Sequence, residues 1–217
     1  MTVDTERALS TEAGAEAGVL RSDDREMKVA QRRWVPGEAG IWALIFTDLT
    51  VFTVYFIDIM IQWHQHPDLF ARGHAATSLT AGILNTFFLL TASLFVALGV
   101  QTLRNGNVVV AQRLFACAGV AGAAFIVNKY FEWSAKLAHG HTPLTDVFFQ
   151  LYFIITGIHL LHVCIAMTLL WYVRRKTREV VGRPTPDQSR FVENCATYWH
   201  MVDLLWLGIL ALFYLMG

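Results

Sequence analysis

The chain alternates between long apolar stretches and short polar connections. Five apolar stretches occupy residues 37–63, 79–102, 114–134, 147–173 and 196–216. A helix rises about 1.5 Å per residue, so about 20 residues cross a hydrocarbon core of about 30 Å. Each stretch reaches roughly this length. The pattern therefore predicts an all-α, polytopic membrane protein in which residues 36–217 form a domain of five transmembrane helices.

The first 35 residues have a different character. They are rich in Ala, Glu, Thr and Arg and contain no apolar run long enough for the core of a signal peptide. We expect residues 1–35 to form a polar, mobile tail. In the whole chain 55% of the residues are hydrophobic and 16% are charged, with a mean hydropathy of +0.43. A soluble domain of this size does not need so much apolar material.

Lys and Arg residues concentrate in alternate connections, as the positive-inside rule describes. Six precede residue 36, two lie between the second and third stretches, and six lie between the fourth and fifth. The other two connections contain only Arg72 and Lys136. This asymmetry predicts a cytoplasmic amino terminus and an external carboxyl terminus. The sequence Arg104-Asn105-Gly106-Asn107 predicts a tight turn between the second and third helices.

Charge balance and cysteine spacing exclude several classes of protein. Acidic and basic side chains balance at 17 each, so no net basic field indicates a nucleic-acid partner. Cys117, Cys164 and Cys195 form no CxxC or CxxxC pair. This spacing argues against a zinc ribbon, a disulfide scaffold and a thiolate-bridged copper centre. We expect the three cysteines to be packing residues.

Ionisable side chains at membrane depth are functional candidates because each is costly unless it is paired or faces protein. Asp48 lies near the middle of the first apolar stretch. His159 and His162 are three residues apart in the fourth, and His200 and Asp203 are three apart in the fifth. Counting residues from the helix ends places Asp48, the histidine pair and Asp203 at similar depth. We expect these groups to meet inside the bundle.

Lys129 and Glu132 form a second polar group nearer the outer surface. They are three residues apart and share one face of the third helix, at the depth of Asn85 and Thr86 in the second. We interpret them as a neutralising ion pair that holds helices together, with proton handling as the alternative. For Asp48, which stands among apolar residues, a neutral hydrogen-bonded acid and a proton-linked carboxylate both remain open.

The histidines are weak candidates for metal or haem ligands. Haem sites with two histidine ligands usually join two helices, whereas His159 and His162 share one helix. His64, His66, His139 and His141 fall in the outer connections, where pairs at i and i+2 are a weak metal signal. We expect ordinary polar residues at these four positions and no metal bound by the chain.

Several motifs together resemble subunit III of the haem-copper oxidases. Residues 198–206 resemble the YWHxVDxxW signature of that family's last helix, and residues 157–163 resemble its GxHxxHV. Residues 84–86 resemble its LNT, and residues 129–132 stand where the family has a polar residue followed by an acid. The resemblance runs in order from Pro36 to the end of the chain. Taken together, these motifs are specific.

Two departures affect the finer assignment. Asp48 stands where mitochondrial members carry a glutamate that reacts with a carboxyl reagent. The mitochondrial members also have two more helices at the amino end. The chain is similar to five-helix bacterial members, which implies a multi-pass protein of the bacterial plasma membrane. Residues 35–42 look more like the branch associated with nitric oxide reductase gene clusters.

The resemblance implies a non-redox accessory subunit of a haem-copper oxygen reductase of the cytochrome c oxidase type, within an aerobic respiratory chain. In the family this subunit flanks catalytic subunit I, with subunit II also present, and haem and copper belong to the partner. It holds phospholipid in a cleft between the first two and the last three helices and supports proton uptake. We expect the following side chains to order the helices and the lipid cleft: Asn85, Lys129, Glu132, His159, His162, Glu193, His200, Asp203 and Trp206. Asp48 is the proton-linked candidate.

Three alternatives remain open at this point. The first is an accessory protein of a nitric oxide reductase. The second is a proton-coupled transporter, which the intramembrane acids and histidines favour and the missing inverted repeat disfavours. The third is a metalloenzyme that uses the outer histidines. The chain has no nucleotide loop and no nucleophile and base arrangement, so we expect no independent catalysis.

Overall fold

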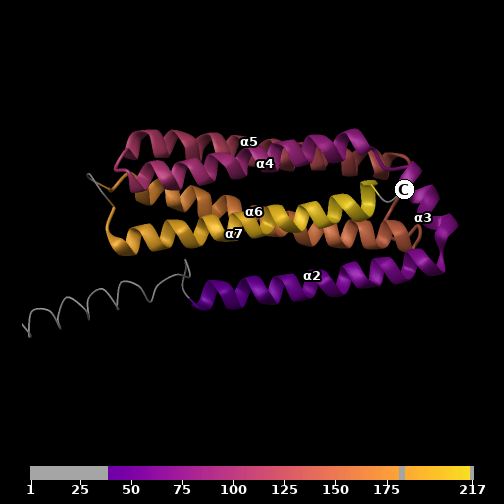
Figure 1. The fold of residues 1–217 in the computed structure, drawn as a ribbon. Helices are drawn as coiled ribbons and strands as arrows, with labels where there is room; N and C mark the ends of the chain where they lie inside the picture. The colour runs from indigo at the N-terminus through magenta and orange to yellow at the C-terminus, as the bar shows by residue number, and fades with distance from the viewer. Residues whose placement is uncertain (1–38, 181–183, 216–217) are drawn as a thin grey trace, which may run out of the picture. The chain divides into compact units, whose positions relative to one another are not determined.

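A computed structural model describes residues 39–180 and 184–215 of the chain, and every regular element in these two ranges is helical (Figure 1). The elements are α2 (Ala39–Gln65), α3 (Pro67–Ala75), α4 (Leu79–Arg104), α5 (Val108–Ala138), α6 (Val147–Thr177), α7 (Pro186–Leu210) and the π-helix η1 (Ala211–Leu215). The predicted tail, residues 1–35, lies outside the described residues. So do Gly182 and Arg183 of the last connection.

Five of the helical segments are long and apolar enough to cross a membrane: Gly40–Gln65, Leu79–Arg104, Val108–Ala138, Val147–Thr177 and Pro186–Leu215. The prediction of an all-α protein with five membrane spans is therefore confirmed. The largest differences are at two starts, where α5 begins at Val108 and α7 at Pro186 instead of residues 114 and 196. The extension of α7 is polar, whereas the extension of α5 begins with the apolar residues Val108, Val109 and Val110.

Caps explain several of these boundaries. At the start of α7, Thr185 Oγ1 accepts from Gln188 N, and the Gln188 side chain accepts from Thr185 N, which is a capping box. Asp146 caps α6 by accepting from Phe149 N at 2.9 Å. The tight turn predicted between α4 and α5 is confirmed, with Gly106 at a φ of 84°, where glycine is favoured.

The short helix α3 lies between α2 and α4 and was not predicted. It is nine residues long and too polar to form a span. Phe70 and Gly73 are its buried residues, and the Phe70 ring meets Phe148 of α6 edge-on with 5.2 Å between ring centroids. A Cβ atom at Gly73 would collide with the Phe148 ring, so this glycine permits the close approach of α3 to α6.

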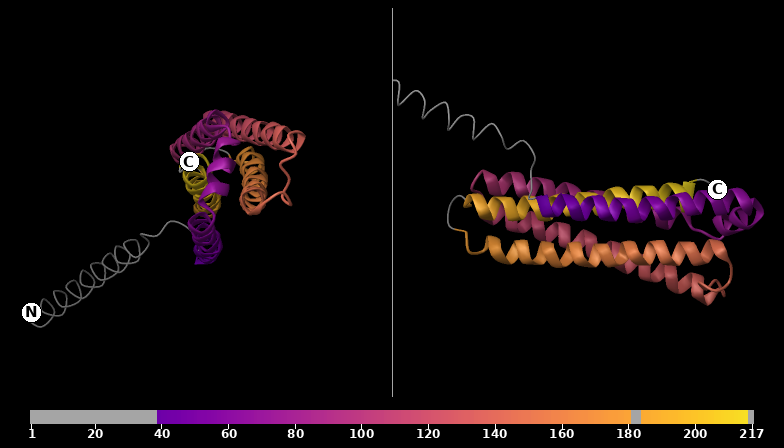
Figure 2. Two further views of the ribbon diagram at one scale, coloured as in Figure 1. Left: turned by 90° about the vertical axis from the view of Figure 1, so that its right-hand side faces the viewer. Right: turned by 90° about the horizontal axis from the view of Figure 1, so that it is seen from below.

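Helices α4 and α5 lie together on one side of α6 and α7, and α2 lies on the other side (Figure 2). The most extensive contact is between α4 and α5, while α7 contacts α4, α6 and α2. The last span, Pro186–Leu215, is the most buried of the five. The expected division into the first two and last three helices is not seen, because α4 packs against α5 and α7 whereas α2 packs against α6 and α7.

Candidate functional site

A carboxylate and an imidazole meet between α2 and α6. Asp48 Oδ2 lies 3.4 Å from His162 Nε2, and His162 Nδ1 lies 2.8 Å from the carbonyl oxygen of Ile158. Because a carbonyl only accepts, Nδ1 carries a hydrogen, and Nε2 is protonated only in the imidazolium form. A charge-assisted hydrogen bond from Nε2 to the Asp48 carboxylate therefore requires the imidazolium form of His162, whereas a neutral His162 can only accept at Nε2.

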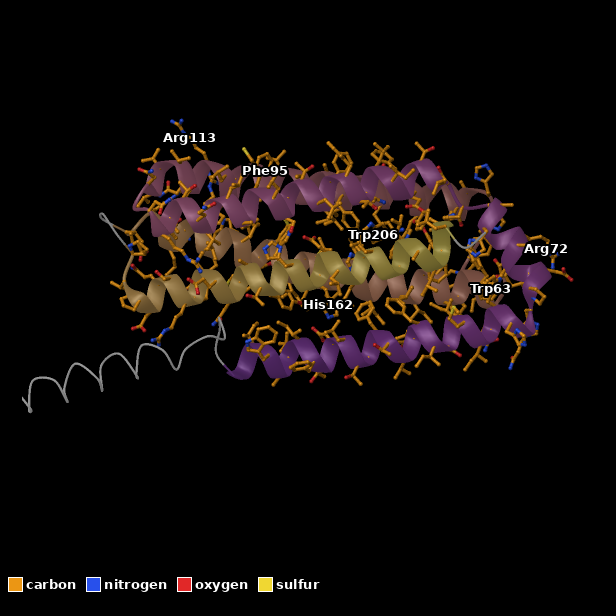
Figure 3. All side chains as sticks on the ribbon, in the orientation of Figure 1. Trp63, Arg72, Phe95, Arg113, His162 and Trp206 are labelled. Carbon is orange, nitrogen blue, oxygen red and sulfur yellow. The ribbon has the colours of Figure 1, made fainter. Side chains whose placement is uncertain are left out.

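The packing of α2 places this pair. Ile45, Phe52 and Ile59 recur every seven residues and are buried, so this face of α2 packs against the bundle. Asp48 lies beside that face, and the Phe52 ring meets the His162 ring edge-on at 5.6 Å. His162 lies between its own helix and α2 in Figure 3. Contacts between α2 and α6 are sparse, so the Asp48–His162 pair is a large part of what links them.

His159 does not join His162, although the two are three residues apart. His159 is fully buried between the rings of Phe125 at 5.8 Å and Trp206 at 5.3 Å. Neither of its ring nitrogens has a hydrogen-bond partner among the described residues. Trp206 is also buried, and its Nε1 donates to Thr86 Oγ1 at 3.0 Å. His159 and Trp206 thus belong to an aromatic core between α5, α6 and α7.

The residues of α7 also separate. His200 Nδ1 and Ser93 Oγ share a hydrogen bond of 2.6 Å that links α7 to α4. Asp203 is buried near Ser93, and neither of its oxygens forms a hydrogen bond of good geometry in the part of the chain described. The structure therefore brings together only Asp48 and His162 of the four groups expected to meet. The other two, His159 and Asp203, lie in separate surroundings.

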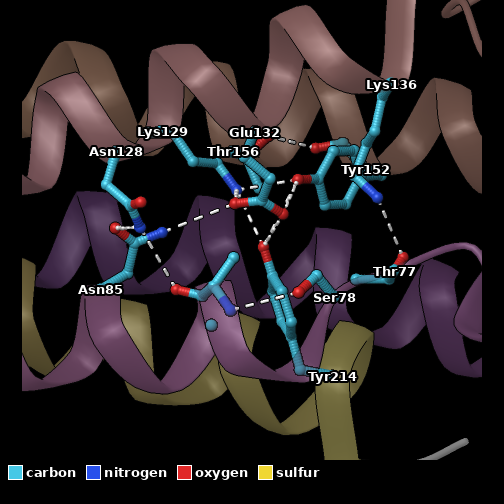
Figure 4. A network of polar contacts seen from close by, with 12 residues as sticks. Thr77, Ser78, Asn85, Asn128, Lys129, Glu132, Lys136, Tyr152, Thr156 and Tyr214 are labelled. Atoms are coloured by element: carbon cyan, nitrogen blue, oxygen red, sulfur yellow. Dashed lines mark hydrogen bonds and ion pairs between the residues drawn. The ribbon is translucent and has the colours of Figure 1, made fainter. Parts of the chain in front are cut away.

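The second polar cluster is compact and buried (Figure 4). Lys129 Nζ donates to Glu132 Oε2 at 3.1 Å and to the hydroxyl oxygens of Tyr152 and Tyr214 at 2.9 Å each. Both tyrosine hydroxyls donate to Glu132 Oε1 at 2.6 Å. Lys129 and Glu132 have side-chain exposures of 1% and 5%. All three ammonium hydrogens have acceptors, and the two charges cancel.

Amides and a second lysine extend this cluster. Asn85 Nδ2 donates to Glu132 Oε2 at 3.5 Å, and Asn128 Nδ2 donates to Asn85 Oδ1 at 2.9 Å. Lys136 Nζ donates to Ala76 O at 3.1 Å and to Thr77 Oγ1 at 3.3 Å. The expected proximity of Asn85 to Glu132 is confirmed, whereas Thr86 pairs with Trp206 instead. The contacts tie α4, α5, α6 and η1 together at one depth.

The remaining candidate residues lie nearer the helix ends. Arg104 of α4 binds Glu193 of α7 through two guanidinium nitrogens, at 2.7 and 3.0 Å from the same carboxylate oxygen. His66 stands at the N-cap of α3, His139 Nδ1 bonds Ala135 O, and His141 stacks on Phe149. Within residues 39–180 and 184–215, no group of three or more His, Cys, Asp or Glu side chains is arranged to hold a metal ion.

The sequence of the chain is similar to those of known membrane proteins over most of its length. The sequence model of the family described as "Cytochrome c oxidase subunit III" matches residues 41–217. The chain belongs to this family. The resemblance inferred from the sequence is therefore confirmed. The five spans and the two polar clusters described above belong to a subunit III protein.

Individual subunit III relatives agree with the family match. The chain is 30% identical to "Cytochrome c oxidase subunit 3" of Corynebacterium diphtheriae over 59% of its own length and 62% of the relative's. It is 25% identical to "Cytochrome bo(3) ubiquinol oxidase subunit 3" of Pseudomonas aeruginosa over 82% and 84%. It is 23% identical to "Heme-copper oxidase subunit I+III" of Aeropyrum pernix over 82% of this chain and 22% of that protein.

The structure adds residues to this subunit III site that were not predicted. Tyr152 and Tyr214 supply the donors to Glu132, and Ser93 is the partner of His200. A buried carboxylate needs several hydrogen-bond donors. This requirement indicates that tyrosines of the other spans are candidate partners of Glu132. Asp58 is a second acid within α2 and was not among the predicted site residues. No ion pair within 4.0 Å joins it to another described residue.

Proposed function

We propose that the chain is a non-redox accessory subunit of a haem-copper oxygen reductase in a bacterial plasma membrane. The observation that carries this proposal is the family match over residues 41–217. Relatives named as subunit 3 of a cytochrome c oxidase and of a ubiquinol oxidase support it from two kinds of oxidase.

Catalytic subunit I is the partner that we propose, with subunit II as a further neighbour. The Aeropyrum protein supports this choice because its printed name joins subunits I and III in one chain. Exposed apolar side chains cover α2 and α4, among them Phe46, Val54 and Phe87, each more than 60% exposed. In a membrane such faces meet lipid or another helix, so α2 and α4 both offer surface to a partner.

We place haem and copper in the partner and not in this chain. The two histidines of α6 do not converge, since His162 contacts Asp48 and the Ile158 carbonyl while His159 is enclosed by aromatic rings. A haem iron with two histidine ligands needs both imidazoles on opposite sides of one macrocycle. His159 and His162 do not fit that requirement.

Asp48 is our candidate for the carboxylate that supports proton uptake by the complex. Its carboxylate lies 3.4 Å from His162, and both side chains retain some exposure, at 22% and 14%. A pair that can change its proton position without losing its partner suits proton exchange with a neighbour. The buried cluster around Glu132 has a different role in this proposal, which is to hold α4, α5, α6 and η1 together.

Lipid binding is the third element of the proposed role. An apolar hollow of about 240 Å³ lies between the ends of α6 and α7 and is lined by side chains that include Tyr172, Lys176 and Phe191. It offers space for an acyl chain with a cation at its side. We also propose that the Arg-rich ends of α6 and α7 face the cytoplasm, because basic residues collect there.

The test is to extract the tagged full chain from its native membranes in mild detergent, record a redox difference spectrum and identify the chains that co-purify. We expect a haem-bearing partner in fixed ratio. The haem type and activity with dioxygen or nitric oxide separate an oxidase from a nitric oxide reductase. A colourless chain that purifies alone, even after cross-linking in the membrane, would contradict the proposal and favour a transporter.

A further inference from the structure

The start of α4 and the end of α5 enclose a hollow at the end of the bundle where α3 lies. Its volume is about 320 Å³. A water molecule takes about 30 Å³ in the liquid, so the hollow has room for several. Small and polar side chains line this α3-end hollow, among them Ala81, Ala135, Ser78, Glu132, Lys136 and His139.

One face of α5 joins the α3-end hollow to the surface. Glu132, Lys136 and His139 are spaced by four and three residues, so they lie on the same side of the helix. Glu132 and Lys136 are buried, whereas His139 is exposed. The helix has 31 residues, about ten more than are needed to cross the hydrocarbon core, so its end lies at the membrane boundary. Polar side chains therefore lead from this boundary to the buried cluster.

Both ends of this path have an atom that can take a proton. His139 Nδ1 lies 2.7 Å from the Ala135 carbonyl and donates to it, so Nε2 of the neutral ring is an acceptor. Glu132 Oε1 accepts two tyrosine hydroxyls at 2.6 Å. Its Oε2 accepts Lys129 at 3.1 Å and Asn85 only at 3.5 Å, which is a weak bond. Oε2 is therefore the less saturated oxygen.

We propose that the α3-end hollow holds water and lets Glu132 exchange protons with the aqueous phase at that end of the bundle. A proton taken up at the surface, by water or by His139 Nε2, passes along hydrogen-bonded water and forms an O–H bond at Glu132 Oε2. The reverse step returns the proton to water. No electron moves, and Lys129 keeps its own protons.

The surroundings of Glu132 hold the carboxyl group in place during this exchange (Figure 4). The tyrosine hydroxyls donate to Oε1, so they remain bound whether or not Oε2 carries a proton. The Lys136 ammonium is fixed by the Ala76 carbonyl and Thr77 Oγ1. The groups around Glu132 come from four elements: Lys129 and Lys136 of α5, Tyr152 of α6, Tyr214 of η1 and the neutral Asn85 of α4.

This exchange site is separate from the Asp48–His162 contact between α2 and α6. It adds a second role to the buried cluster, which also holds four elements together. The inference rests on this chain's own residues and not on the proposed oxidase role. The full chain in vesicles can therefore test it without a partner.

Cysteine accessibility tests whether the hollow holds water. In a C117A/C164A/C195A background, we expect A81C, in the wall of the hollow, to react with a charged methanethiosulfonate added to both sides of the membrane. V127C is the control, because Val127 is a 54% exposed apolar residue of α5 that does not line the hollow. It should not react. Equal reaction of both, or reaction of A81C only with an apolar maleimide, would overturn the proposal.

A water-soluble carbodiimide tests access to the Glu132 carboxyl group. Peptide masses would show its modification, either by an added amine or as an amide bond to Lys129. We expect modification in the wild type and its loss in A135F, which fills the hollow from an exposed position and leaves Glu132 unchanged. The matched variant A138F adds the same ring at an exposed position of α5 outside the hollow and should retain it. Equal modification in the two variants, or modification only by a lipid-soluble carbodiimide, would contradict access through water.

Discussion

Lys129 and Tyr214 are 85 residues apart in the chain, yet the ammonium of the first donates a hydrogen bond of 2.9 Å to the hydroxyl of the second. Through this contact the last described turn of the chain is attached to the middle of the bundle. Tyr214 also donates to Glu132, so the same hydroxyl satisfies both members of a buried ion pair. Substitutions in this cluster should therefore destabilise both α5 and the carboxyl end of the chain.

Removal of one charge from the cluster should be costly. Glu132→Leu leaves the Lys129 ammonium buried without its counter-charge, and we expect a loss of about 3–5 kcal/mol in stability, measured by thermal unfolding in detergent. The double variant Lys129→Met/Glu132→Leu removes both charges and should recover much of this loss. If the double variant loses as much stability as the sum of the losses in Lys129→Met and Glu132→Leu, the ion pair is not the source of the effect.

Tyr214→Phe tests the attachment of η1. The variant keeps the ring and removes one hydroxyl that bonds a charged carboxylate, so we expect a loss of about 1.5–3 kcal/mol. Limited proteolysis should show faster cleavage at the carboxyl end. Tyr130→Phe is the matched control, because Tyr130 is 68% exposed and its hydroxyl is not part of this cluster. Equal effects of the two substitutions would contradict the prediction.

Asp48→Asn tests the proposed role of the Asp48 carboxylate at the α2–α6 contact. An amide can still reach His162 but cannot exchange a proton at neutral pH. We expect the complex to assemble and its activity to decay faster during turnover, as measured by oxygen consumption over time. Asp48→Glu, which retains the acid, should decay more slowly than Asp48→Asn. Unchanged activity, turnover lifetime and assembly in Asp48→Asn would remove Asp48 from the proposed function.

His74 gives the end of the bundle at α3 a pH dependence. Burial lowers the pKa of His74 below its ordinary value of 6.5, and a hydrogen bond from Nδ1 to the Phe213 carbonyl offsets this only in part. The folded state favours the neutral ring, so its contribution to stability is present above that ordinary value and is lost as the pH falls toward the lowered pKa. Melting temperature should therefore drop in mild acid. His74→Asn, which cannot titrate, should show a smaller drop; an identical drop would argue against His74.

Gly73→Ala tests the contact of α3 with α6. The added methyl group would collide with the Phe148 ring, and we expect a loss of about 1–3 kcal/mol from overpacking. Gly119→Ala is the control, because nothing lies within 4 Å of a Cβ atom at that position of α5. It should be neutral or slightly stabilising, since alanine favours helix over glycine. Thermal unfolding of both variants in the same detergent measures the difference.

Some features of this protein follow from the sequence alone. The lengths of the apolar stretches predict five spans, because the bilayer sets the length of a helix that crosses it. The motifs around His159, His162 and His200 indicate the family, and Gly106 indicates the turn between α4 and α5. The approximate depth of each ionisable residue also follows, since helical rise is constant.

Other features needed the tertiary structure. Depth alone places Asp48, His159 and Asp203 together, but only His162 lies within contact distance of Asp48. Helical periodicity determines which residues share a face, and not how neighbouring helices rotate or shift against each other. The choice of Tyr152 and Tyr214 as donors to Glu132 depends on that rotation. The first turns of α5 and α7 lie before the predicted apolar stretches. A capping box defines the start of α7, and α5 begins directly after the turn at Gly106.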